Sequence, residues 1–167
     1  MKASAWADGG EAALLTDLYE LTMMQAYFEE GLHEPAVFDL FFRKLPPKRG
    51  YLLAAGLETC LSYLESLRFS AESLDYLASL ETFSSAFLDY LADFRFTGDV
   101  RAVPEGTPVF PNEPLLEVEA PLPQAQLAET FLLNQVHLQT LLASKASRVV
   151  DAAAGRPVVD FGARRMH

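Results

Sequence analysis

The sequence predicts an α+β fold, in which helices and a small antiparallel sheet lead into the first strand of an incomplete α/β barrel. Three observations favour this fold. Apolar residues recur at helical spacing before residue 95 and again from about residue 124. Short β-like pieces punctuated by Gly and Pro occupy 95–121. An almost wholly apolar run over 157–161 is typical of a strand that is buried on both faces.

The first half of the chain is expected to contain four helices and one strand. Asp17 and Glu20 have the spacing of a capping box, which predicts a helix over 17–30. The segment 36–43 alternates as a strand does, with Phe38 and Leu40 on one face. The other helices are expected over 57–67, after the capping residue Ser70, and near 85–94.

A long helix over 124–154 is expected to end at Gly155 and to lead into the strand at 157–161. A buried parallel strand needs neighbours on both sides, so we expect the chain to be the front part of a longer protein. The expected apolar face of the helix is made by Leu127, Phe131, Asn134, Leu138, Leu141, Lys145 and Val149. The expected divisions are a disordered N-terminus (1–12), an α+β domain (13–122), and the long helix with the first, truncated barrel part (123–167).

Composition narrows the class of protein. Half of the 167 residues are apolar and 22% are charged, as in ordinary globular proteins. A net charge of −10 argues against a nucleic-acid partner. Cys60 is the single cysteine, and we find no signal peptide and no apolar run long enough for a membrane helix. We therefore expect a cytoplasmic protein that has no membrane partner.

Basic residues gather at two places in this acidic sequence. One group of four lies within 43–49, and a second lies at the C-terminus. The members are Arg43, Lys44, Lys48, Arg49, Arg164 and Arg165, with His167 beside the second group. Two local basic spots suit a small anionic ligand better than a polymer, while solvated loop charge remains the alternative for the first group.

Six segments in order give the sequence a more specific likeness. They are LLTDLYELTM (14–23), FDLFFRKLP (38–46), GYLLAAGLE (50–58), GDVRAVPEGTPVFPNEPLLEVEAP (98–121), ETFLLNQVHLQTLLASKA (129–146) and DFGARR (160–165). In this order they resemble successive blocks of nicotinate phosphoribosyltransferases, which belong to the type II phosphoribosyltransferases. The stretch from Val103 to Pro121 is the most specific of the six.

The resemblance implies an enzyme of NAD salvage. Such enzymes join nicotinate to phosphoribosyl pyrophosphate, giving nicotinate mononucleotide and pyrophosphate. The reaction is coupled to ATP hydrolysis through a phosphorylated histidine and uses Mg2+. The family forms homodimers with shared sites. No residue here matches the phosphorylated histidine, and none of the barrel's catalytic residues lies within these 167 residues, so the fragment alone is expected to be inactive.

The same resemblance assigns roles to individual residues. Asp17 and Tyr19 match a motif that reaches the pyridine base from one subunit, and Phe161 and Arg164 match a motif from the other. Two aromatic rings can enclose a pyridine ring, and a guanidinium group matches a planar anion. The implied phosphate-binding residues are Arg43, Lys44 and Arg165, and His167 is a further candidate for the wall of the site. No protein metal ligand is implied.

Two alternatives stay open at this point. The chain as given could serve as a truncated, non-catalytic dimerisation or binding module. A relative that uses nicotinamide or quinolinate is also compatible with the sequence, because the choice of base depends on barrel residues that lie outside it. Ala163 and Met166 depart from the residues that the family usually has there, which leaves the shape of the pocket open.

Overall fold

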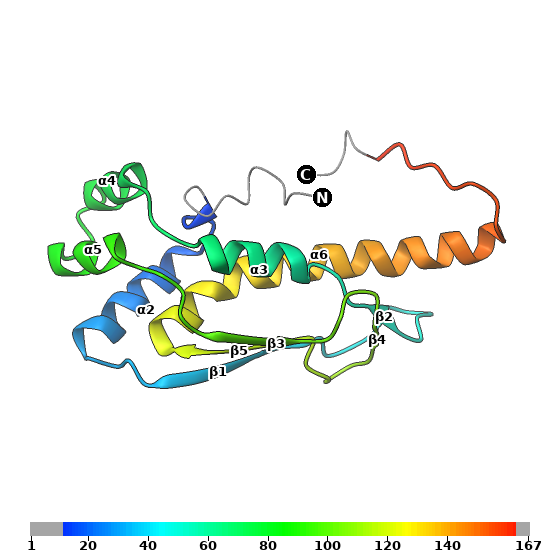
Figure 1. Cartoon of the computed structure of the whole chain (residues 1–167), viewed down its shortest axis with the longest axis horizontal. Coiled ribbons are helices and arrows are strands. Elements are labelled where there is room, and N and C mark those ends of the chain that lie inside the picture. Colours follow the sequence, from blue (N-terminus) through cyan, green and yellow to red (C-terminus); the bar gives the residue numbers. More distant parts are fainter. Residues whose placement is uncertain (1–11, 163–167) are drawn as a thin grey trace.

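The computed structural model describes residues 12–162, so the disorder expected for most of 1–12 and the residues 163–167 lie outside the described part. Helices and two small antiparallel sheets make up the fold, as predicted (Figure 1). The elements are α2 (Leu18–Glu29), β1 (Pro35–Leu40), β2 (Leu52–Leu53), α3 (Leu57–Ser66), α4 (Ala71–Ser79), α5 (Ser85–Ala92), β3 (Asp99–Ala102), β4 (Pro108–Val109), β5 (Leu116–Pro121) and α6 (Leu122–Ala153).

The larger sheet has the strand order β1-β5-β3, with both pairs antiparallel. Phe38 of β1 lies opposite Val118 of β5, which in turn lies opposite Val100 of β3. The predicted alternation in β1 is confirmed, because Phe38 and Leu40 are partly buried while Val37 and Asp39 are exposed. The smaller sheet pairs Leu52 of β2 with Val109 of β4.

Helix α6 is the central element of the fold. It contacts α2, α3, β1, β2 and β5, and Figure 1 shows it running the length of the molecule above the larger sheet. The tightest ring contact of the core joins α3 to α6, where Tyr63 stacks on Phe131 at a centroid distance of 3.7 Å and an interplanar angle of 7°. Within 12–162, no helix combines the length and the hydrophobicity needed to cross a membrane.

The buried face of α6 differs from the predicted one after Phe131. Asn134, Lys145 and Val149 are exposed, whereas Gln135, Thr140 and Ser144 are buried. The physical reason is that polar side chains of α6 bond to the backbone around β2. Leu53 donates its N–H to Ser144 Oγ at 2.8 Å, and Ala55 donates to Thr140 Oγ1 at 3.2 Å. A polar residue can therefore belong to the buried face of this helix.

The predicted cap at Ser70 is confirmed, a further cap at Ser84 that was not predicted is formed, and the predicted capping box at Asp17 is wrong. Ser70 accepts from the N–H of Ser73, and Ser84 accepts from that of Phe87. Asp17 occupies the N-cap position of α2 but makes no side-chain cap bond. Its expected partner in a capping box, Glu20, is instead buried against α6.

The strand predicted for 157–161 is not formed. This segment follows α6 without regular structure, and its side chains face solvent, with Val159 70% and Phe161 77% exposed. A strand takes its backbone hydrogen bonds from a neighbouring strand, and no strand of the described part pairs with this segment. An apolar run alone is therefore not sufficient to make it a strand.

Candidate functional site

The start of α2 presents two of the predicted site residues. Asp17 lies at the N-cap, and Tyr19 follows in the first turn with 48% of its surface exposed. The Tyr19 hydroxyl donates to Glu20 Oε1 over a long 3.4 Å, and Thr130 Oγ1 of α6 lies 3.5 Å from Asp17 Oδ2. The arrangement leaves an aromatic face available to a flat ligand, with a carboxylate beside it.

Glu20 fastens this helix start to α6. Its side chain is fully buried. The hydroxyl of Thr130 donates to Glu20 Oε1 at 2.9 Å, and the hydroxyl of Thr16 donates to Glu20 Oε2. Buried carboxyl groups need such donors, because desolvation is otherwise costly. Glu20 therefore fixes the position of the turn that bears Tyr19.

Negative charge and desolvation set the protonation of this region. Desolvation is the main cause that raises the pKa of Glu20, and the carboxylates of Glu129 and Asp17 act in the same direction. The hydrogen bonds from the two threonine hydroxyls oppose this shift. Desolvation also raises the pKa of Tyr19, together with the charge of Glu129 and Glu20.

Arg43 and Lys44 lie three and four residues after Leu40, the last residue of β1, and both are exposed. The backbone just before them is held in place, since Asn112 and Leu115 donate their N–H groups to the carbonyls of Phe42 and Leu40, each at 2.8 Å. The two cations therefore lie at a defined end of the larger sheet. No described contact joins them to Asp17 or Tyr19.

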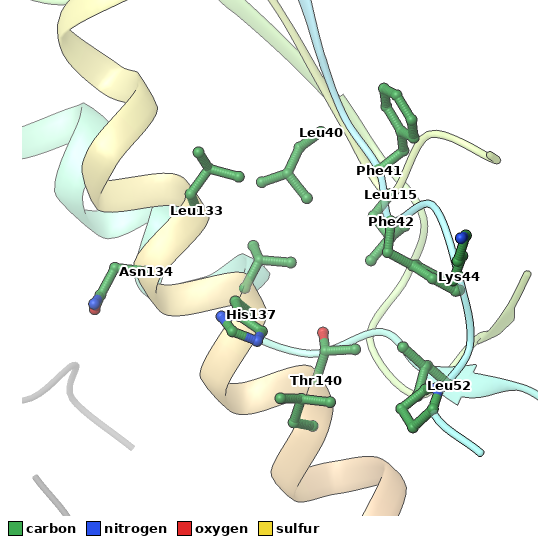
Figure 2. Close-up of a pocket in the computed structure, with 13 residues that line it drawn as sticks. Leu40, Phe41, Phe42, Lys44, Leu52, Leu115, Leu133, Asn134, His137 and Thr140 are labelled. Carbon is green, nitrogen blue, oxygen red and sulfur yellow. The ribbon is translucent and has the colours of Figure 1, made fainter. Parts of the chain in front are cut away.

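An open cavity of about 620 Å³ lies between this end of β1 and α6. Figure 2 shows Leu40 and Leu133 pointing toward each other across it, with Lys44 on the strand side. Its wall is mostly apolar, and the lining residues are Leu40, Phe41, Phe42, Lys44, Pro46, Leu52, Leu115, Leu133, Asn134, Val136, His137, Thr140 and Leu141. Such a cavity can hold an apolar body, with few polar groups to orient it.

The remaining predicted residues are not brought to these places. Phe161 lies beyond the end of α6 and contacts no ring of the described part, so one chain does not enclose a ligand between Tyr19 and Phe161. Arg164, Arg165 and His167 lie outside the described residues. Among residues 12–162, no group of three or more His, Cys, Asp or Glu side chains could hold a metal ion.

Sequence reasoning missed the anchoring role of Glu20 and the whole cavity. Glu20 was expected to cap its own helix, and the partner that draws it inward, Thr130, lies 110 residues away. His137, an exposed residue of α6, lies in the wall of this cavity. Neither contact leaves a local pattern, so the printed sequence offered no signal for them.

Comparisons with known proteins give the chain a family. Residues 14–137 match the model of the nicotinate phosphoribosyltransferase (NAPRTase) N-terminal domain. A nicotinate phosphoribosyltransferase of Mycobacterium tuberculosis is 61% identical over 155 residues, which cover 93% of this chain and 34% of that protein. The Bacillus subtilis protein of the same name is 45% identical over 156 residues, covering 93% and 32%. The chain thus spans about a third of the length of these curated relatives.

Solved structures agree with the sequence match. The crystal structure of human nicotinic acid phosphoribosyltransferase aligns with a TM-score of 0.77 at 39% identity, covering 87% of this chain and 30% of that one. A nicotinate-nucleotide pyrophosphorylase from Pyrococcus furiosus aligns with a TM-score of 0.70 at 23% identity, which shows a shared fold only. The match over residues 14–137, together with these identities, shows that the chain belongs to the nicotinate phosphoribosyltransferase family.

Proposed function

We propose that this chain is the N-terminal part of an enzyme that makes nicotinate mononucleotide and pyrophosphate from nicotinate and phosphoribosyl pyrophosphate. The observation that carries the proposal is the 61% identity over 155 residues to a curated nicotinate phosphoribosyltransferase. Because the chain spans about a third of such proteins, the activity is proposed for a protein that also has the remaining part.

In this proposal Tyr19 and Asp17 hold the base. The exposed Tyr19 ring offers a stacking surface, which is worth about 0.5–1.5 kcal/mol beyond area burial. Glu20 supports the role by anchoring this turn to α6, so the backbone that bears Tyr19 has little freedom to lose on binding. Phe161 and Arg164 complete the base site from the other subunit of a homodimer. The exposure of Tyr19 and Phe161 is compatible with such a shared site.

Arg43, Lys44 and Arg165 are proposed to contact phosphate groups, with His167 nearby. A guanidinium group binds phosphate through paired hydrogen bonds, and an ammonium group adds a point charge. ATP is the proposed co-substrate, and Mg2+ would accompany the phosphates. The described residues alone supply no cluster of His, Cys, Asp or Glu that could hold the ion. A cytoplasmic location fits the single, buried Cys60, which can form no disulfide within the chain.

A chimera tests the proposal directly. Residues 1–167 are joined to the part of the Mycobacterium tuberculosis relative that follows its matching segment, and product formation is measured with nicotinate, phosphoribosyl pyrophosphate, ATP and Mg2+. We expect activity from the chimera and none from the 167-residue chain alone. Parallel assays with nicotinamide and with quinolinate identify the base. A folded chimera that is inactive with nicotinate, or that prefers another base, contradicts the proposal.

Matched variants test the role of Tyr19 in that chimera. Tyr19→Ala should raise the KM for nicotinate by about tenfold, the effect of losing a contact of about 1.4 kcal/mol. Tyr76→Ala is the control, because Tyr76 is also an exposed tyrosine of a helix, α4, and no role is assigned to it. Equal effects of the two substitutions would remove Tyr19 from the base site.

A further inference from the structure

A second, smaller pocket lies between the loop that precedes β2 and the C-terminal half of α6. Its volume is about 190 Å³. The loop contributes Lys48, Arg49, Gly50 and Tyr51, and α6 contributes Ser144 and Arg148. Three of these six residues carry a positive charge. The sequence showed two of the cations as part of a basic run, but Arg148 joins them from a position 100 residues further along the chain.

The positive charge of this pocket is not neutralised within the described part of the chain. The ion pairs found among residues 12–162 all belong to Arg101, which binds Glu117 at 2.7 Å and Glu119 at 3.0 Å. Lys48, Arg49 and Arg148 have no carboxylate partner there. In a chain with a net charge of −10, three unpaired cations around one small pocket create a local positive field that attracts anions.

Arg49 gives the pocket an unsatisfied donor. Its Nη1 atom is buried and has no hydrogen-bond partner, a state that few buried polar atoms of folded proteins show. Burying a charged donor without a partner is costly, and an anion seated in the pocket would supply the missing acceptor. Lys48 adopts a left-handed backbone conformation (φ 63°), so the loop turns sharply beside this atom.

Arg148 is held at the same place by the loop itself. Its Nη1 atom donates to the carbonyl of Lys48 at 3.5 Å, which links α6 to the loop and leaves the other donors of the guanidinium group free. The Ser144 hydroxyl already donates to the Thr140 carbonyl and accepts from the N–H of Leu53. It therefore lines the pocket and is not assigned a contact with the ligand. Tyr51 adds a hydroxyl group on the loop side.

We propose that this pocket binds the phosphate group of a small ligand. Two guanidinium groups offer paired donors that match phosphate oxygens, and the ammonium of Lys48 adds a third charge. Three cations suit the phosphate dianion better than the single charge of a carboxylate. The inference rests on these contacts alone and holds whether or not the chain's proposed enzymatic function is correct.

The test is a titration of the full 167-residue chain with inorganic phosphate, at constant ionic strength, followed by amide chemical shifts. We expect saturable shifts at 48–51 and around Arg148. Arg148→Gln should weaken the Kd about tenfold or more, since a hydrogen bond to a charged group contributes about 1.5–3 kcal/mol. Lys48→Gln should weaken binding in the same direction. Arg68→Gln is the matched control, because it removes one exposed arginine at the far end of α3 from β2.

Two further ligands define the chemistry. Methyl phosphate distinguishes the sources: binding as tight as that of inorganic phosphate assigns the pocket to a phosphate ester, and weaker binding assigns it to the free ion. Acetate should bind more weakly than either. The proposal is overturned if phosphate causes no saturable shifts at the pocket, if acetate binds equally well, or if Arg68→Gln weakens binding as much as Arg148→Gln.

Discussion

Glu20 connects the candidate site at the start of α2 to the buried core beside α6. Its buried carboxyl group receives hydrogen bonds from Thr16 and Thr130, while its neighbour Tyr19 faces solvent. The raised pKa of Glu20 means that the folded chain holds this proton more tightly than the unfolded chain does. Ionisation of Glu20 at neutral pH therefore works against the folded state.

This linkage gives the first prediction. Below the ordinary pKa of glutamate both states are protonated, and the group imposes no penalty. As the pH rises through the raised pKa, the unfolded state has already released its proton, so the free energy of unfolding should fall. Glu20→Gln should remove this part of the pH dependence while keeping a side-chain oxygen for the threonine hydroxyls. Urea unfolding between pH 5 and 8 measures the free energy of unfolding of both proteins.

The control for Glu20 is Glu65→Gln. Glu65 is an exposed glutamate of α3, so its substitution makes the same change of charge at the surface. The curves for this variant and for the wild type should run parallel, because other titrating groups cancel in the comparison. If the free energy of unfolding of Glu20→Gln also changes with pH in parallel with that of the wild type, the titration of Glu20 is not linked to folding.

At the scale of elements, helix α6 packs closely against Gly56, which follows β2. Among the described glycines with a left-handed backbone, this is the one with the closest neighbouring atoms. Gly56, the N-cap of α3, has φ 107°. A Cβ atom there would lie 3.1 Å from the carbonyl oxygen of Gln135 and 3.2 Å from Val136 Cα. Helix α3 therefore approaches α6 so closely that its start requires a residue without a side chain.

Gly56→Ala should lower the free energy of unfolding by more than the left-handed conformation alone explains. Gly106→Ala provides the comparison, because Gly106 also has positive φ (80°) but open space where its Cβ would lie. The conformational cost is roughly 1–2 kcal/mol for each variant. Overpacking against the α6 backbone should add about 1–3 kcal/mol for Gly56→Ala only. Denaturant unfolding of both variants measures the difference, and equal destabilisation would contradict the close approach.

Local sequence patterns predicted most helices and strands. The features that were not predicted depend on contacts between residues that lie far apart in the sequence. The predicted cap Ser70 accepts from the N–H of Ser73 three residues later, so the local sequence contains both partners of the bond. The burial of Thr140 and Ser144 was not predicted, because their partners, Ala55 and Leu53, lie 85 and 91 residues away. The strand predicted for 157–161 was wrong for the same reason, since the hydrogen bonds of a strand depend on a neighbouring strand.

At the scale of the whole molecule, the candidate site is distributed over distant parts of the chain. The sequence correctly indicated Asp17 and Tyr19 at a helix start and Arg43 and Lys44 at the end of a strand. It gave no indication of the cavity beside Lys44 or of Arg148 beside Lys48, because each joins segments about 100 residues apart. Figure 1 shows the segment after α6 apart from the start of α2, so the proposed base site would need a second subunit to bring Phe161 to Tyr19.

The last prediction tests that requirement in the chimera described above. At nicotinate concentrations below the native KM, Tyr19→Ala and Arg164→Ala should each impair turnover, and mixing the two variants should restore part of it. In a mixed dimer both substitutions fall in one site, which leaves the other site with a native Tyr19 and a native Arg164. Random exchange makes roughly half of the dimers mixed, so recovery toward about a quarter of the native sites is expected from two-fold symmetry.

Melting measurements on the same samples separate this role from a structural one. Because Tyr19 is 48% exposed, Tyr19→Ala should change the melting temperature little. A loss of about 3–5 kcal/mol, the usual cost of truncating a buried aromatic side chain, would instead mark Tyr19 as a core residue. Subunit exchange is verified with two differently tagged proteins. If exchange is complete and the mixture stays inactive, Tyr19 and Arg164 do not serve one site from opposite subunits, and the shared site must be abandoned.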